Sequence, residues 1–163
     1  MNNKYGEALD HTSKQKYVDW HEYAYKDDLL SCDALENVSS RNAIVHGYYA
    51  MLNAALLYFA KVHNLKINKD HVHDYVPFAL LDMIKDKATR DEIKYLIDQA
   101  KKEYDIFENK DASYLPAMVF SAKSERNKSS YYRSDDEFLK EKYLIFRKDF
   151  VNPFIKIITE LKI

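Results

Sequence analysis

Apolar and aromatic residues recur at intervals of three or four along most of the chain, which is the spacing of amphipathic helices. Between Thr12 and Ser31 this spacing, set among charged residues, predicts a surface helix with one buried stripe. From Ile44 to Val62 nearly every position is apolar or aromatic. A helix that is apolar on most of its sides belongs at the centre of a bundle, so we expect this segment to form the core.

A third amphipathic segment, Val72–Ile84, is interrupted by Pro77. Proline is tolerated in a first helical turn and disrupts later turns, so this helix either begins near Val76 or is kinked there. Residues 109–133 have weak periodicity and a polar tract, which predicts a long loop that a short helix over 117–122 would shorten. Loops of this length inside a compact domain often carry function.

Two sequence signals predict the starts of the later helices. Thr89–Glu92 has the spacing of a capping box, in which a hydroxyl and a carboxylate satisfy the amides at a helix start, and it predicts a helix through about Phe107. Ser134–Glu137 repeats this pattern at the start of a last helix. Pro153 lies inside that helix and predicts a kink.

Residues that favour turns are few, because the 163-residue chain has only two glycines and three prolines. Sheets joined by tight turns need such residues at short intervals, so long helical segments are favoured. The length is that of one ordinary domain, and 47% hydrophobic residues are enough for a core. We therefore predict an all-α, up-and-down bundle of four to five helices in a single domain spanning residues 1–163.

Charge and cysteine content restrict the partners and the compartment. The 25 basic and 26 acidic side chains leave a net charge of −1, so RNA binding would require a local patch. Cys32 is the only cysteine, which excludes an internal disulfide and a thiolate zinc cluster. The chain shows neither a secretory signal nor a run of roughly 18 apolar residues. We expect a soluble, cytoplasmic protein that has no cofactor and no membrane contact.

His71 and His73, together with Asp70 and Asp74, resemble metal ligands in composition. Side chains two residues apart on a helix point in different directions, and no matching pair occurs elsewhere in the sequence. We therefore predict a solvated helix start there, and no metal site. The sequence also lacks a glycine-rich phosphate loop and a nucleophile elbow, so phosphoryl transfer by the chain alone is not expected.

Two stretches carry a resemblance to a known family. Val38–Ala55, which contains Tyr-Tyr-Ala-Met and then Ala-Ala, is similar to the second helix of HEPN domains. Arg126–Tyr132 resembles the Arg-x-x-x-Asp-Tyr element that precedes the last helix in small stand-alone HEPN proteins. With the helix order included, the resemblance spans about residues 33–161. It implies a helical bundle that often forms a homodimer.

Many HEPN proteins are metal-independent endoribonucleases that use an arginine and a histidine four to six residues apart, and the resemblance implies the same activity here. Arg41 and His46 match this spacing as Arg-x4-His, and Asn42 supplies the polar residue that commonly follows the arginine. Tyr48 completes an Arg-x4-His-x-Tyr string that is found in toxin members. Ribonuclease members generally carry the motif later in the chain. The resemblance implies Arg41 and His46 as catalytic residues and Asn42 and Tyr48 as substrate contacts.

The chemistry of RNA cleavage suits these two residue types. Without a metal, cleavage needs a base for the 2′-hydroxyl, an acid for the leaving oxygen and a cation for the phosphate. Histidine suits the proton transfers and arginine the phosphate. On a regular helix, however, residues five apart are separated by about 140°, so Arg41 and His46 converge only if the helix begins after Arg41. Alternatively, Arg41 pairs with an acidic neighbour and His46 is a satisfied histidine beside the core.

A second candidate site comprises Arg126, Asn127, Tyr131 and Tyr132. A cation beside aromatic rings suits single-stranded RNA or a nucleotide, because bases stack on such rings. The alternative is a solvated loop whose tyrosines anchor it to the bundle. An approach of Arg126 to His46 across the bundle would favour a composite site.

These patterns leave three hypotheses. The first is a HEPN protein that acts on RNA as a metal-independent endoribonuclease of a toxin–antitoxin or defence system. The second is a non-catalytic HEPN module that binds a nucleotide or a nucleotidyltransferase-type antitoxin partner through residues 126–133. The third is a purely structural helical dimer.

Overall fold

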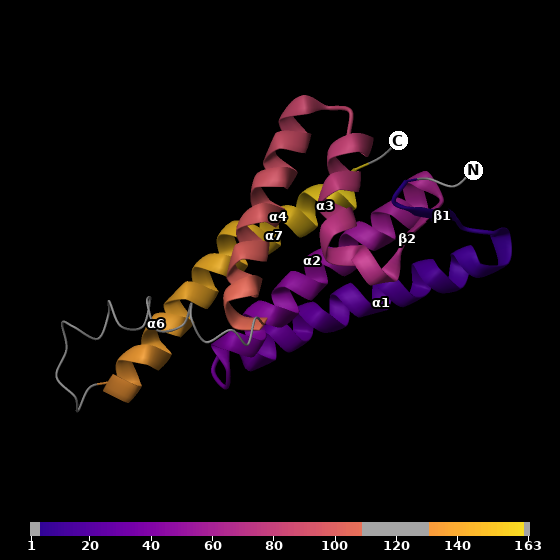
Figure 1. Ribbon diagram of the computed structural model, residues 1–163. Coiled ribbons are helices and arrows are strands. Elements are labelled where there is room, and N and C mark those ends of the chain that lie inside the picture. The colour runs from indigo at the N-terminus through magenta and orange to yellow at the C-terminus, as the bar shows by residue number, and fades with distance from the viewer. Residues whose placement is uncertain (1–3, 109–130, 162–163) are drawn as a thin grey trace.

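The computed structural model describes residues 4–108 and 131–161, and only the backbone of residues 131–136. In chain order the elements are β1 (Gly6–Ala8), α1 (His11–Leu35), α2 (Ser40–His63), β2 (Leu65–Ile67), the 3₁₀ turn η1 (Lys69–His71), α3 (Val72–Met83), α4 (Lys87–Glu108), α6 (Tyr131–Phe146), the π-helical turn η2 (Arg147–Val151) and α7 (Asn152–Glu160). Because α6, η2 and α7 form one continuous rod, the described chain is a bundle of five helices (Figure 1). The predicted all-α bundle is confirmed.

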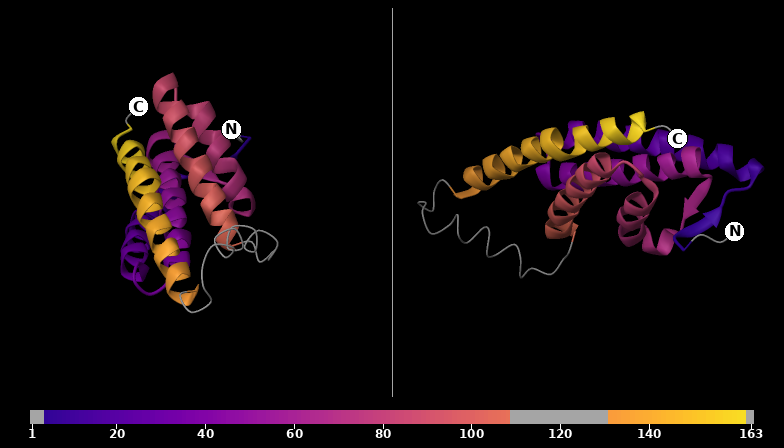
Figure 2. Two further views of the ribbon diagram at one scale, coloured as in Figure 1. Left: turned by 90° about the vertical axis from the view of Figure 1, so that its left-hand side faces the viewer. Right: turned by 90° about the horizontal axis from the view of Figure 1, so that it is seen from above.

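Helices α1 and α2 form an antiparallel hairpin along almost their whole lengths (Figures 1 and 2). The carboxylate of Asp10 caps α1 by accepting from the backbone N–H groups of Thr12 and Ser13 at 2.9 and 2.8 Å. The hydroxyl of Ser39 caps α2, and Asn64 ends that helix in the left-handed conformation, with φ of 54°. These end signals define α2 as a helix that begins before Arg41.

Helix α2 is the centre of the core, as its apolar pattern predicts. Its fully buried side chains include Tyr48, Met51 and Phe59, and they pack against side chains from every other helix. By length and mean hydropathy (1.3) α2 could cross a membrane, which was not predicted from the sequence. In this bundle 78% of its apolar window is buried. The helix thus has the burial of a core helix.

The later helices depart from the sequence prediction at their ends. Helix α4 begins at Lys87, because the Asp86 carboxylate rather than the Thr89 hydroxyl caps it, accepting from the Thr89 N–H at 2.8 Å. Helix α3 starts at Val72 and continues through Pro77. The disturbance expected at Pro153 takes the form of η2, whose wider turn bonds the Asn152 N–H to the Arg147 carbonyl. Proline lacks an N–H and its ring clashes with the carbonyl four residues earlier, which favours this local widening.

A small antiparallel sheet was not predicted. Strand β1 pairs with β2, with Gly6 opposite Ile67 and Ala8 opposite Leu65. The sheet ties the start of the chain to the connection between α2 and α3. Three-residue strands are too short to produce a clear alternating pattern in the sequence.

Candidate active site

A polar stripe runs along the otherwise apolar helix α2. It consists of Asn42, His46, Tyr49 and Asn53. Spacings of four, three and four residues place these side chains on one side of the helix. Asn42 is exposed and the other three are partly buried, whereas nearly all other positions from Ala43 to Ala60 are buried. Polar residues that interrupt a core helix on one side mark this surface as the candidate site.

His46 is held by a carboxylate from the neighbouring helix. Its Nδ1 lies 2.9 Å from Oδ1 of Asp28 on α1. Because a carboxylate only accepts, Nδ1 carries the proton and donates it, which leaves Nε2 as the second functional nitrogen of the ring. The His46 side chain is 38% exposed and that of Asp28 is 18% exposed. An accessible imidazole with a fixed tautomer is the arrangement that acid–base catalysis requires.

The hydrogen bonds continue beyond this pair. Asn53 donates through Nδ2 to the other carboxylate oxygen of Asp28, at 2.9 Å. The amide oxygen of Asn53 in turn lies 2.8 Å from Nδ1 of His21 on α1. Burial lowers the pKa of His21, and the hydrogen bond to Asn53 opposes this effect. Four side chains therefore form one continuous chain between α1 and α2.

Tyr49, rather than Tyr48, shares the His46 side of the helix. The Tyr49 hydroxyl lies 3.2 Å from the Tyr104 hydroxyl on α4, and its ring meets the His73 ring edge to face at 5.9 Å. Tyr48 is completely buried, with its ring 4.5 Å from that of Tyr104. Burial also raises the pKa of Tyr48. The predicted substrate contact at Tyr48 therefore does not agree with its position in the core.

Arg41 points to a different neighbour from His46. Its guanidinium donates to the Phe107 carbonyl at the end of α4, from Nε at 3.1 Å and from Nη2 at 2.6 Å. An arginine at this place satisfies a terminal carbonyl and complements the negative end of the helix dipole. Since α2 already includes Arg41, the separation of about 140° from His46 applies and the two side chains diverge. The condition for convergence, a helix that begins after Arg41, is therefore not met. Within residues 4–108 and 131–161 the hydrogen-bond partner of Arg41 is a carbonyl rather than the acidic neighbour of the alternative prediction.

The second predicted site cannot be placed with respect to His46. Arg126 and Asn127 lie outside the described residues. Tyr131 and Tyr132 begin α6, where only the backbone is described. Asn42, the remaining predicted contact, is exposed in the first turn of α2, and its N–H donates to the Ser39 hydroxyl at 3.4 Å.

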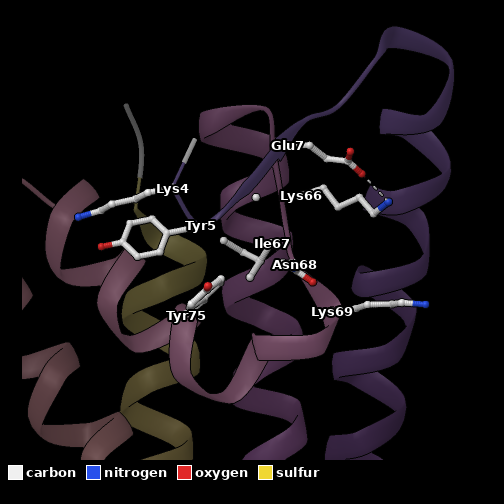
Figure 3. A pocket seen from close by; sticks show the side chains of 9 residues that line it. Lys4, Tyr5, Glu7, Lys66, Ile67, Asn68, Lys69 and Tyr75 are labelled. Carbon is white, nitrogen blue, oxygen red and sulfur yellow. Dashed lines mark hydrogen bonds and ion pairs between the residues drawn. The ribbon is translucent and has the colours of Figure 1, made fainter. Parts of the chain in front are cut away.

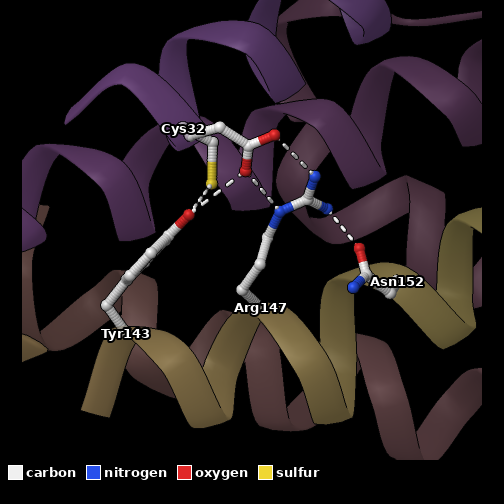
Figure 4. Close-up of polar contacts among 5 residues, drawn as sticks. Cys32, Tyr143, Arg147 and Asn152 are labelled. Atoms are coloured by element: carbon white, nitrogen blue, oxygen red, sulfur yellow. Dashed lines mark hydrogen bonds and ion pairs between the residues drawn. The ribbon is translucent and has the colours of Figure 1, made fainter. Parts of the chain in front are cut away.

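A separate polar cluster ties the last rod to α1 (Figure 4). Arg147 donates to both carboxylate oxygens of Asp33, from Nε at 2.9 Å and from Nη2 at 3.2 Å, and also to Asn152. Tyr143 donates to Asp33 at 3.3 Å and accepts from the Cys32 thiol. Cys32 is completely buried, and this burial raises the pKa of its thiol. A neutral, buried thiol is a poor nucleophile, so this cluster fixes η2 against α1 rather than forming a reactive centre.

A surface pocket of about 470 Å³ opens beside the small sheet (Figure 3). Its lining includes Lys4, Lys66 and Lys69, and in Figure 3 Lys4 points to one side of the pocket while Lys66 and Lys69 point to the other. Lys66 is paired with Glu7 at 2.9 Å. Diverging and paired cations do not form a focused anion site. Across residues 4–108 and 131–161, no group of three or more His, Cys, Asp or Glu side chains is arranged to hold a metal ion.

His46 was predicted from its spacing to Arg41, whereas the residues that hold it were not predicted. A spacing of seven residues separates His21 from Asp28 on α1, and the same spacing separates His46 from Asn53 on α2. This spacing places each pair on one side of its helix. That matched spacing in adjacent helices was the available signal.

Comparisons of this chain with protein-family models, with curated proteins and with solved structures find no match.

Proposed function

We propose that this chain is a HEPN-type protein that cleaves RNA without a metal ion, with His46 as its acid–base residue. The observation that carries the proposal is the hydrogen bond of 2.9 Å between Nδ1 of the partly exposed His46 and the Asp28 carboxylate. Acid–base catalysis needs a group that titrates near neutral pH and is held in one orientation. His46 is a histidine that the Asp28 carboxylate holds in one orientation at the accessible surface of α2.

In this mechanism His46 Nε2 accepts the proton of the RNA 2′-hydroxyl. The resulting oxygen attacks the adjacent phosphorus and forms a 2′,3′-cyclic phosphate, while the bond to the 5′-oxygen of the next nucleotide breaks and that oxygen takes up a proton from water. Asp28 stabilises the imidazolium that forms and keeps its Nδ1 proton in place. Arg41 is exposed at the start of α2 but diverges from His46, so its proposed contact is a neighbouring phosphate of the RNA strand rather than the phosphate that is cleaved. The homodimer implied by the HEPN resemblance stays a prediction, and it would supply a second His46.

The test is cleavage of a labelled single-stranded RNA by the purified full chain in excess EDTA. We expect products that end in a 2′,3′-cyclic phosphate, and no cleavage of the matching DNA, which lacks the attacking hydroxyl. His46→Ala should lower kcat/KM by roughly 10²-fold to 10⁴-fold, the usual contribution of a positioned acid–base group. Asp28→Asn should act mainly on kcat, because it disturbs the tautomer of His46.

One control variant, at His11, and one further variant, at Arg41, separate a catalytic role from general damage. His11→Ala removes an exposed histidine from the first turn of α1 and should leave cleavage unchanged. Arg41→Lys keeps the charge but loses the two-pronged geometry of the guanidinium, so it should raise KM more than it lowers kcat. Cleavage that is equally fast in His46→Ala, or no cleavage by the parent chain, would contradict the proposal. RNA binding without cleavage would favour the non-catalytic module.

A further inference from the structure

The donor and acceptor directions in the chain from His46 to His21 are fixed by chemistry. Only the NH₂ end of the Asn53 side chain can donate to the Asp28 carboxylate, at 2.9 Å. The oxygen end of the same amide must then face His21, 2.8 Å away. That oxygen only accepts, so His21 carries a proton on Nδ1 and donates it. His46 and Asn53 therefore both donate to Asp28, and His21 donates to Asn53.

We propose that Asn53 and His21 are positioning residues that hold Asp28 so that the proton of His46 stays on Nδ1 and Nε2 remains available to substrate. This inference rests on the proposed function of His46. Asn53 occupies one oxygen of Asp28 and leaves the other for His46. His21 and Asp28 together prevent the Asn53 amide from rotating. A flipped amide would turn its oxygen toward the Asp28 carboxylate, which also only accepts, and its NH₂ group toward the N–H of His21.

The surroundings of these residues support a role beyond packing. Apart from Tyr58, Asn53 is the one polar residue of α2 between Met51 and Ala60, in a segment whose other side chains pack in the core. His21 is the one buried polar residue of the described chain, at 8% exposure. Buried polar groups are costly unless they are hydrogen-bonded, and an apolar pair would pack at these positions without that requirement. The ring of Tyr17 lies 4.3 Å from that of His21 and shields it.

The test compares three variants with the parent chain by ¹⁵N NMR of histidine-labelled protein, at a pH where the imidazoles are neutral. Asn53→Leu removes the donor to Asp28, and His21→Phe removes the donor to Asn53 while keeping a ring. His21→Asn is the conservative variant, because its amide NH₂ can replace Nδ1 as the donor. Asn37→Leu, in the exposed turn between α1 and α2, is the matched control. Circular dichroism checks that each variant is folded.

We expect the parent spectrum to show His46 protonated at Nδ1. In Asn53→Leu and His21→Phe the Nε2-protonated form, which free histidine prefers, should increase. His21→Asn and Asn37→Leu should keep the parent tautomer. In the RNA assay Asn53→Leu should lower kcat by about tenfold to a hundredfold, as for other residues that orient a functional side chain, and should change KM by less than about twofold.

The NMR and kinetic results fail in distinguishable ways. A parent chain that cleaves no RNA would overturn the proposed function, while the NMR comparison would still decide the positioning role. A His46 tautomer that is unchanged in Asn53→Leu, or a parent His46 protonated at Nε2, would overturn the positioning role even if RNA is cleaved. An equal loss of activity in His21→Asn and His21→Phe would reduce the role of His21 to packing.

Discussion

Gly47 follows His46 and lies where α2 meets η2 and α1. A Cβ atom at this position would lie 2.7 Å from Cε1 of Phe146, 3.2 Å from Cγ2 of Val151 and 3.3 Å from Sγ of Cys32. All three neighbouring side chains are completely or almost completely buried. Gly47→Ala therefore tests whether the packing around the candidate site is as close as the structure shows.

Two opposing effects determine the result. Replacing glycine by alanine inside a helix stabilises it by about 1 kcal/mol, since glycine has more backbone freedom to lose on folding. Carbon atoms pack favourably at about 3.5–4.0 Å, so the Phe146 ring would have to move by about 1 Å. Overpacking of a core typically costs about 1–3 kcal/mol, from which the helix gain is subtracted. We expect Gly47→Ala to lower the free energy of unfolding by about 1 kcal/mol.

Urea denaturation followed by circular dichroism measures this change, and a thermal scan should show a melting temperature lower by about 2–4 °C. The double variant with Phe146→Leu removes the nearest atom. In the Phe146→Leu background Gly47→Ala should become neutral or stabilising, which corresponds to a coupling of about 1 kcal/mol or more. An alanine that stabilises the parent chain would refute the close packing of Gly47 against Phe146.

Two further predictions follow from buried polar groups. Tyr48→Phe should raise the free energy of unfolding by up to about 1–3 kcal/mol and leave RNA cleavage unchanged, because the buried Tyr48 hydroxyl has no hydrogen-bond partner within the described part of the chain. Urea denaturation and the RNA assay check this, and a destabilised or inactive variant would contradict it. Burial lowers the pKa of His21 below its ordinary value of 6.5, so the unfolded chain binds a proton that the native chain does not. The free energy of unfolding should therefore be fully retained above pH 6.5 and fall as the pH drops below it. Urea titrations at pH 7.5 and 5.5 should show a smaller loss of this free energy in His21→Phe than in the parent chain. An equal loss in the variant and the parent would assign the effect to other groups.

The fold could be predicted from the sequence because its main signals are strong and local. The apolar segment that forms α2 has the composition of a core helix, and the scarcity of glycine and proline disfavours a sheet whose strands are joined by tight turns. The ends of the elements were less predictable, because several residues compete for each cap. Asp86 precedes Thr89 by three residues and its carboxylate accepts from the Thr89 N–H and hydroxyl, so a motif search that begins at the hydroxyl starts the helix too late.

The candidate site was harder to predict, because it depends on which side of a helix each residue occupies. In the string Arg-x4-His-x-Tyr, Tyr48 is two residues from His46 and therefore about 200° away around the helix, which directs it into the core. Tyr49, three residues away, lies on the His46 side. The same geometry separates Arg41 from His46 once Ser39 is fixed as the cap of α2.

The partner of His46 could have been found by extending this reasoning across the hairpin. Helices α1 and α2 are antiparallel neighbours, so side chains seven residues apart in one helix can meet a pair with the same spacing in the other. His21 and Asp28 meet Asn53 and His46 in this way, and the two histidines occupy opposite ends of one hydrogen-bond chain. One histidine is buried and kept neutral, while the other is accessible and held by a carboxylate. That difference in surroundings, which no motif records, is the reason we propose the reactive role for His46 and the supporting role for His21.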